Sequence, residues 1–571
     1  MRRHGDLLFG MAAAVLSLVA AVVFLKLWDA DLGIPFDYSG DTVLNLTVVK
    51  TVMEHAWYLH NPDLGAPHGQ DLYDYPVASA DTLNLIFFRL GGLLTDNPAA
   101  VMNVFYVLTF PLIAVTAFVV LRRLPVSRGI ALVCALLYTL LPYHFLRGEV
   151  HLFLAAYYAV PIAAYLMIGV FRGDRLFGRW RPTLMTAALC TVVAAASGSF
   201  YYSAFTVLLV IVAALLRFVA QRDREALVAG GGVVAVILAV SLIQLAPTIV
   251  YRIDHGTNDQ VAKRYWFESE VYGLKLTNLL LPVDHHRIGA LARRKAEYGR
   301  QIPQTEGQVA TLGVVASAGF LWLLGVALAA CVGAGRRYSL GLHGGLAALT
   351  VVSVLFATTG GFSTLLGVVW PQIRSWNRIS VFIAFFSLAA VALLLETLRG
   401  ALARRRLPAL VFPAVLAAVL AVGVFDQTTP AYIPAYGALK TAYRNDEQFA
   451  ASLEEQLPAE ASIVQLPYEP FPEPALGGRA PYDPAKPYLH SHDLRWSWGA
   501  MRGRPEDWAA TIAGKPAAQV VPAARREGFS GILLDRTAYG AAAASVEADF
   551  GKVTGSEPEP SRDGRYVFFG L

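Results

Sequence analysis

Two aspartates follow the first long apolar stretch of the chain, in the motif FDYSGD at residues 36–41. A carboxylate beside a lipid bilayer is costly to keep without a partner or a task, and it can accept a proton from a reacting hydroxyl. Asp41 is therefore our first candidate for a general base, and Asp37 is the second. The competing interpretation is that Asp41 only accepts backbone N–H groups at the start of the helix predicted from Thr42.

A second polar turn, at residues 143–151, carries Arg147, Glu149 and His151 at the junction of two apolar runs. Ionisable groups in such a place need partners or a cavity. One interpretation gives Arg147 an anionic group, and Glu149 or His151 a role in proton transfer, substrate binding or metal binding. The alternative is an Arg147–Glu149 ion pair of purely structural importance.

A third polar segment mixes aromatic and charged side chains in a pattern suited to a sugar that lies on aromatic faces. Its candidate substrate-binding residues are Arg264, Glu268, Glu270, Tyr272 and Lys275. Residues 272–281 also predict a helix on the membrane surface. The adjacent pair at 285–286 could bind a metal, although neighbouring histidines without a spaced acidic partner are a weak metal signal.

Arg374 and Arg378 lie four residues apart and are predicted to share a helix face beside the tenth apolar run. Guanidiniums at a lipid boundary attract an anion, and a phosphate matches their geometry. Ordinary interfacial snorkelling is the alternative. Near the C-terminus, His492 and Arg495 belong to a segment that predicts either a lid over a site or packing against the membrane part.

The composition indicates a membrane protein, because 56% of the 571 residues are hydrophobic and 16% are charged. The mean hydropathy is +0.48. Apolar runs of about 20 residues match a hydrocarbon core of about 30 Å. The candidate spans are 7–28, 101–121, 129–145, 152–171, 183–197, 202–220, 226–251, 310–332, 339–358, 379–398 and 408–425. The net charge of +5 comes from arginines beside these runs, which argues against a nucleic-acid partner.

Arginines gather at every second junction between spans, as at Arg122/Arg123 and Arg336/Arg337. The positive-inside bias makes these junctions and the N-terminus cytoplasmic. We therefore expect a polytopic α-helical domain of about 11 spans over 1–428, with long outer loops at 29–100 and 253–308. Residues 429–571 predict a small extracytoplasmic α/β domain, with strands at 462–466 and 531–535 and a helix at 446–456.

The first outer loop has two further features. Leu44, Val48 and Val52 recur at helical spacing, which predicts an amphipathic helix on the membrane surface. The polar, turn-rich segment 61–76 is typical of a ligand-binding loop.

The chain resembles the GT-C class of integral-membrane glycosyltransferases in four features. They are the acidic pair Asp37 and Asp41, the helix from Thr42, a second acidic region at Glu149 or at Glu268 and Glu270, and the arginines Arg374 and Arg378. Segment 61–76 is also similar to a bacterial subgroup of that class. The resemblance implies an enzyme of the bacterial plasma membrane that takes a sugar from a polyprenyl phosphate. It would transfer that sugar, with inversion, to an envelope glycan, lipid or protein on the outer face.

The implied roles are a general base for Asp41 or Asp37, and donor-phosphate binding for Arg374, Arg378 and Arg147. The spacing departs from Asp-x-Asp, so the metal and cofactor stay open, with a divalent cation as one option. Two rival functions share this architecture: a flippase or transporter for lipid-linked glycans, and a non-catalytic subunit of polysaccharide assembly. A transporter would need polar groups at mid-membrane, where the sequence offers mainly Ser241 and Gln244.

Overall fold

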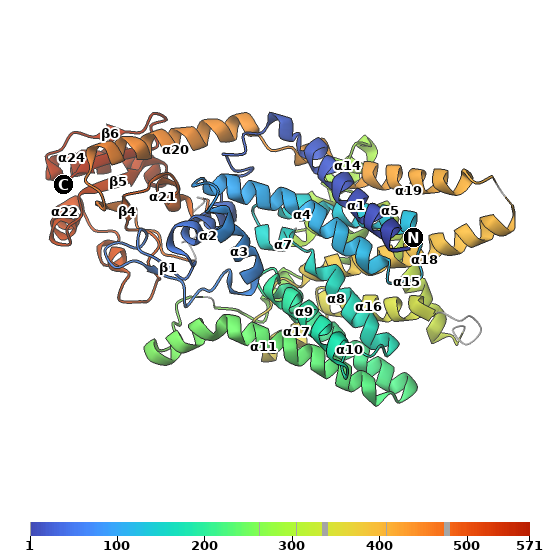
Figure 1. The fold of residues 1–571 in the computed structure, drawn as a ribbon. Coiled ribbons are helices and arrows are strands. Elements are labelled where there is room, and N and C mark those ends of the chain that lie inside the picture. The colour runs from blue at the N-terminus through green and yellow to red at the C-terminus, as the bar shows by residue number, and fades with distance from the viewer. Residues whose placement is uncertain (1, 262, 304, 334–340, 407, 473–479) are drawn as a thin grey trace.

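The computed structural model describes residues 2–261, 263–303, 305–333, 341–406, 408–472 and 480–571 (Figure 1). It shows a helical bundle that holds the N-terminus at one end and a part containing a β-sheet, with the C-terminus, at the other (Figure 1). The predicted basic junction Arg336/Arg337 and the first two residues of the predicted span 339–358 lie outside the described residues.

Each predicted apolar run forms helix in the described part of the chain. The bundle helices are α1 (Arg2–Leu25), α4 (Pro98–Leu121), α5 (Arg128–Thr139), α8 (Ala159–Arg172), α9 (Trp180–Ala195), α10 (Tyr201–Gln221), α11 (Arg224–His255), α15 (Val314–Cys331), α16 (Gly341–Ala357), α18 (Ser380–Arg404) and α19 (Val411–Gln427). By length and apolar composition, seven described helical segments can each cross a membrane, or up to eight if the bent pair at 411–456 is one span. The helices α8 and α16 are apolar but shorter. The fold is thus a multi-pass helical one, and eleven crossings stay a prediction.

The helix α18 is the centre of the bundle. Its first half is buried from Ser380 to Leu393, and it packs against α15, α16, α5 and α8. Gly319 of α15 permits this closeness, because a Cβ there would lie 2.2 Å from the carbonyl oxygen of Ser387. By contrast, the exposed side chains of α1 include Leu7, Leu8 and Val15. Such an apolar outer surface is what a lipid solvent requires.

The first outer loop forms α2 (Asp41–His55), β1 (His60–Asn61), β2 (Gln70–Asp71) and α3 (Thr82–Gly91). The prediction that α2 lies on a membrane surface is wrong. Its residues Thr42–Met53 are all buried, because α3 and α4 cover one side and α21 (Lys486–His490) and neighbouring segments of the C-terminal part cover the other. The helix is therefore enclosed between two parts of the protein.

Shorter helices occur between the long ones. They are α6 (Pro142–Arg147), α7 (Leu152–Ala155), α12 (Glu268–Val271), α13 (Leu276–Leu280), α14 (Gly289–Gln301) and α17 (Phe362–Val369). The predicted surface helix over 272–281 is in fact broken, because Leu274 forms a β-bridge with Thr358 between α12 and α13.

The C-terminal part contains a five-stranded sheet in the order β4-β3-β5-β7-β6. Its elements are α20 (Tyr436–Gln456), β3 (Ser462–Leu466), α21 (Lys486–His490), β4 (Arg495–Trp496), α22 (Ala517–Arg526), β5 (Gly531–Asp535), α23 (Arg536–Tyr539), α24 (Ala543–Thr554), β6 (Glu559–Pro560) and β7 (Tyr566–Gly570). Strand β3 is parallel to β4 and β5, whereas β7 is antiparallel to β5 and β6. The predicted strands are β3 and β5, and the predicted helix is the second half of α20.

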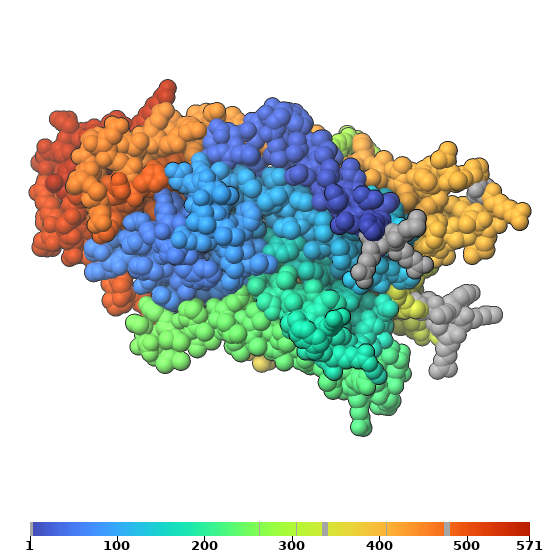
Figure 2. Space-filling model, in the orientation of Figure 1, coloured from blue at the N-terminus to red at the C-terminus, as the bar shows by residue number. Residues whose placement is uncertain are grey.

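The first outer loop and the C-terminal part meet along a continuous boundary (blue against orange and red in Figure 2). Backbone hydrogen bonds join them: Gly65 N donates to Trp498 O at 2.8 Å, and Trp496 N donates to Asp63 O at 2.8 Å. Gln70 Nε2 donates to Gly499 O at 2.8 Å. Polar groups of segment 61–76, which the sequence predicts to bind a ligand, therefore form hydrogen bonds that hold the two parts together.

Candidate functional site

Asp41 is the first residue of α2. Gly40 precedes it with φ 54° and ψ −133°, a backbone conformation open essentially to glycine alone. This turn lets the helix begin at Asp41, whose carboxylate accepts no hydrogen bond within the part that the structure describes. The side chain is 45% exposed, and its Oδ2 lies 3.7 Å from Nε2 of His151. The carboxylate thus does not cap the helix, and it is accessible to a ligand.

Two buried arginines converge on one carboxylate beside Asp41. The side chains of Arg147 and Arg378 are 1% and 8% exposed. Arg378 Nη2 donates to both oxygens of Glu306 at 3.0 Å. Arg147 Nη2 lies 3.0 Å from Glu306 Oε2 and also donates to Asn377 Oδ1 at 3.2 Å. Glu306 therefore bridges two guanidiniums whose residues lie more than 200 positions apart in the sequence.

Arg374 completes the cationic group. It precedes the short 3₁₀ turn Trp376–Ile379, so the prediction that Arg374 and Arg378 share one helix is wrong. Its guanidinium lies 3.5 Å from Glu268 and 5.2 Å from the ring centroid of Tyr272. With 33% of its side chain exposed, Arg374 is the most accessible of the three arginines.

The electrostatics of this group connect its members. Burial raises the pKa of Asp41, and Glu306 adds to the effect, whereas Arg378, Arg374 and Arg147 oppose it. Burial would also raise the pKa of Glu306, but the guanidiniums of Arg378 and Arg147 more than offset it and lower the pKa to about 2. Burial and the same arginines lower the pKa of His151 to about 3, so this imidazole is neutral at ordinary pH.

Glu149 lies in a different environment. It is 3% exposed and accepts hydrogen bonds from the backbone N–H groups of Phe36 at 2.7 Å and Asp37 at 3.3 Å. Burial raises its pKa to about 8. The alternative of an Arg147–Glu149 ion pair is wrong, because Arg147 is paired with Glu306. Glu149 instead fixes the backbone of the loop that leads to Asp41.

Asp37 does not join Asp41 among the arginines. Its Oδ1 accepts hydrogen bonds from the backbone N–H of Ser39 at 2.9 Å and from the Ser39 hydroxyl at 3.1 Å. This is the local turn that short acidic side chains commonly make. The geometry separates the two aspartates and favours Asp41 for chemistry.

Three of the remaining predicted site residues, Arg264, Glu270 and Lys275, belong to the third polar segment. Burial and Asp41 raise the pKa of Tyr75, whereas Arg264 lowers it, so Arg264 and Asp41 both influence this tyrosine. Glu270 accepts hydrogen bonds from Gly360 N and Thr364, and Lys275 donates to Pro303 O. These two side chains are used in packing.

Two predicted residues of the C-terminal part lie apart from this group. His492 has its ring 3.9 Å from Glu54, and Arg495 pairs with Glu460 at 3.1 Å. Of the adjacent histidines at 285–286, His285 is exposed, whereas His286 is buried and lies 3.3 Å from Asp426.

Glu306 was missed by the sequence reasoning. It is a single carboxylate a few residues before an apolar run, in the outer loop 253–308. The available signal was charge balance, since buried arginines require a carboxylate nearby.

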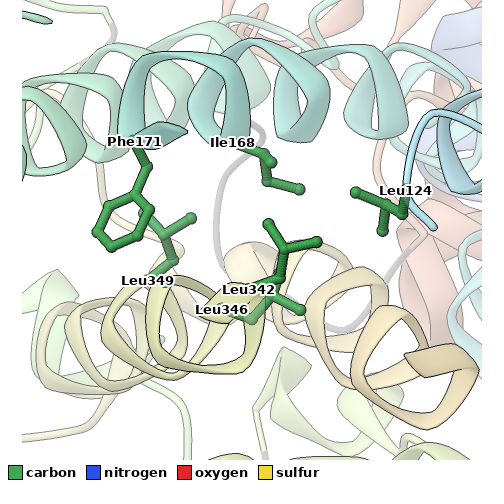
Figure 3. Close-up of a pocket in the computed structure, with 7 residues that line it drawn as sticks. Leu124, Ile168, Phe171, Leu342, Leu346 and Leu349 are labelled. Carbon is green, nitrogen blue, oxygen red and sulfur yellow. The ribbon is translucent and has the colours of Figure 1, made fainter. Parts of the chain in front are cut away.

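Two other features bear on ligands. The cavity between α8 and α16 is lined by Leu124, Ile168, Phe171, Leu342, Gly345, Leu346 and Leu349 (Figure 3). This lining is wholly apolar and offers no reactive group. Asp41 and His151 could hold a divalent cation between them. Glu306, the carboxylate beside them, is already paired with two arginines.

Comparisons with known proteins bear on the fold. No protein-family model matches the sequence, and no curated protein matches it. The archaeal oligosaccharyltransferase AglB from Archaeoglobus fulgidus, solved with an inhibitory peptide and a dolichol-phosphate, aligns over 100% of this chain and 74% of its own, with 11% identity and a TM-score of 0.48. ArnT from Cupriavidus metallidurans, solved in the apo state, aligns over 97% of each chain, with 12% identity and a TM-score of 0.53. The chain thus shares the fold of ArnT along nearly its whole length, and the predicted resemblance is confirmed at the level of the fold.

Proposed function

We propose that this chain is a membrane glycosyltransferase that moves a sugar from a polyprenyl phosphate to an acceptor hydroxyl. The observation that carries the proposal is the group formed by Asp41, His151 and the Arg147–Glu306–Arg378 cluster, with Arg374 on Glu268 beside it. It combines an accessible carboxylate with cations held at fixed positions. The positive-inside pattern supports an extracytoplasmic position for this group, and the proposed acceptor there is an envelope glycan, lipid or protein.

In this mechanism Asp41 accepts the proton of the acceptor hydroxyl as that oxygen attacks the anomeric carbon. The bond from the sugar to the phosphate breaks on the opposite face, which gives inversion. Arg374, with the greatest exposure, meets the leaving phosphate, and Arg378 and Arg147 stabilise its growing charge. A raised pKa suits a general base, because catalysis is most efficient when the pKa approaches the working pH.

Gln244, a polar residue that a transporter could use at mid-membrane, already has hydrogen-bond partners within the bundle. Gln244 accepts a hydrogen bond from Thr82 at 2.7 Å and donates to the carbonyl of Ala194 at 3.1 Å. It therefore packs the bundle and does not serve a translocation path, which favours the enzyme over the flippase.

The test is release of polyprenyl phosphate from polyprenyl-phosphate sugars by the purified protein, with and without a chelator or an added divalent metal. We expect Asp41→Asn to lower release by about 10²–10⁴-fold, while Asp37→Asn, the matched control, keeps most of the activity. A fully active Asp41→Asn protein would refute the assignment of the base. No release from any donor, with lipid binding intact, would favour the flippase or the non-catalytic subunit.

A further inference from the structure

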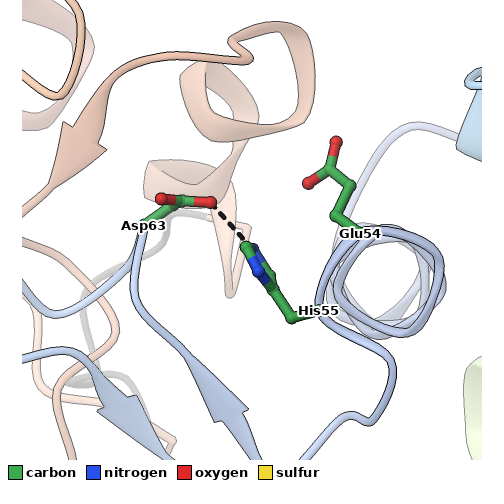
Figure 4. Close-up of side chains that lie close together, drawn as sticks. All are labelled: Glu54, His55 and Asp63. Atoms are coloured by element: carbon green, nitrogen blue, oxygen red, sulfur yellow. Dashed lines mark hydrogen bonds and ion pairs between the residues drawn. The ribbon is translucent and has the colours of Figure 1, made fainter.

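A second group of chemically competent side chains lies at the opposite end of α2 from Asp41. Glu54, His55 and Asp63 point toward one another (Figure 4), and each offers a ligand atom within 4.8 Å of the other two. The closest contact joins His55 Nε2 and Asp63 Oδ2 at 2.8 Å. One imidazole and two carboxylates within this distance match the ligand set of a divalent transition metal.

A candidate fourth ligand, outside this three-residue group, is available from the C-terminal part. Nδ1 of His492 lies 3.9 Å from Glu54 Oε1, and its side chain is 62% exposed. Two histidines and two carboxylates would complete the four-coordinate shell that zinc prefers. The side chains of the three inner residues are 22–30% exposed, so an ion can enter from solvent.

The backbone around this group is held in place by interactions that no metal has to supply. Asp63 O accepts a hydrogen bond from Trp496 N at 2.8 Å, and Asp63 N donates to Asn61 Oδ1 at 2.9 Å. The backbone N–H groups of His492 and Asp493 both donate to Glu454. The ligands are therefore pre-positioned on both sides of the boundary between the first outer loop and the C-terminal part, which lowers the cost of binding.

Among the described residues, Lys50 competes with an ion for Glu54. Its Nζ donates to Glu54 Oε1 at 2.7 Å and to the carbonyl of Ser491 at 2.9 Å. The other oxygen of Glu54 is left for an ion, and the ammonium keeps its bond to Ser491 if Glu54 turns. The charges also balance, because the two positive charges of the ion would face the two carboxylates of Glu54 and Asp63. Lys50 would keep its hydrogen bond to the Ser491 carbonyl.

We propose that Glu54, His55, Asp63 and His492 form a binding site for a divalent transition metal of the zinc class. The site links the first outer loop to the C-terminal part. It is distinct from the Asp41 group, because the length of α2 separates them by about 20 Å at 1.5 Å per residue. Its role is to fix the far end of the helix that carries Asp41.

The experiment measures bound metal in the full chain, purified without a histidine tag, after chelation and reloading with Zn²⁺. We expect about one equivalent to bind and to raise the melting temperature, and Asp63→Asn and His492→Ala to weaken binding at least about tenfold. His492 is largely exposed, so its variant separates loss of a ligand from loss of folding. Asp71→Asn is the matched control, because the His60–Asp71 pair (2.8 Å) lies in the same loop and is in no such three-ligand group of the described residues.

Activity is not a readout, so the outcome is independent of the proposed transferase. Asp41→Asn must retain the ion, which excludes binding between Asp41 and His151 as its source. Wild-type protein that takes up no Zn²⁺ would overturn the proposal, and so would equal binding by Asp63→Asn and His492→Ala.

Discussion

Replacing Glu306 by Gln tests whether one carboxylate holds the cationic group together. The substitution keeps the shape of the side chain and removes its charge, while Arg147 and Arg378 remain charged because guanidinium does not deprotonate in proteins. The new amide can accept a hydrogen bond from one guanidinium, but its NH₂ group faces the other. Two almost fully buried cations are then left without a counterion.

Two estimates of the cost agree. The pKa of Glu306 is lowered from 4.5 to about 2, and a shift of that size corresponds to about 3 kcal/mol of native-state stability. Removing one partner of a buried ion pair typically costs about 3–5 kcal/mol. Because the pKa is lowered, the contribution is complete above about pH 4.5 and is lost as the pH falls toward 2. The Gln variant should lack this contribution at neutral pH.

The assay is the melting temperature of the purified protein, with and without added sulfate. Glu306→Gln should melt well below the wild type, and sulfate should stabilise the variant more, because an anion can replace the lost carboxylate between the two guanidiniums. Glu297→Gln is the matched control in the same outer loop. Its partner Arg294 is 79% exposed, so the change should stay within about 1 kcal/mol. A Glu306→Gln protein that melts like the wild type and responds equally to sulfate would refute the reasoning.

Two further predictions concern pH and the boundary between the two parts. The transferase rate, measured as kcat/KM, should rise with pH through one group whose pKa lies above 3.8, because Asp41 must be deprotonated to act; a rate that is flat or falls over this range would contradict Asp41 as the base. Asp74 is 1% exposed and is bound by Arg504 at 2.6 and 2.9 Å, so Asp74→Asn should destabilise the protein by about 3–5 kcal/mol. Thermal unfolding measures this, with Arg495→Ala as the exposed control (about 1 kcal/mol or less); equal effects of the two variants would count against a role for Asp74 at the boundary.

The local parts of the fold could be read from the sequence. The strands at 462–466 and 531–535 were predicted because short apolar runs between turn residues are typical of buried strands. The apolar helices followed from length and hydropathy alone. Arg147, Arg374 and Arg378 were predicted as one set because guanidiniums near lipid need an anion, and the structure brings them together around Asp41.

The long-range parts could not be read in this way. On α2, the repeat of Leu44, Val48 and Val52 predicts one buried face, and nothing local shows that Lys50 and Thr51 are buried as well. Their cover comes from residues more than 400 positions later, where Ser491 accepts from Lys50 and Tyr488 lies 3.5 Å from Thr51. A side chain that is polar on one helix can be satisfied by any distant segment, so a periodic pattern sets only a lower limit to burial.

The same contacts explain why the C-terminal part matters to the Asp41 group. Tyr38, three residues before Asp41, donates to Asp446 at 2.9 Å and lies 2.8 Å from His490. Lys50, nine residues after Asp41, is bonded to Ser491. The loop and the helix on either side of Asp41 are therefore fastened to the C-terminal part, while the Asp41 carboxylate stays 45% exposed. This arrangement fits a part that positions the proposed general base, and it accounts for the burial of α2 better than a lid would.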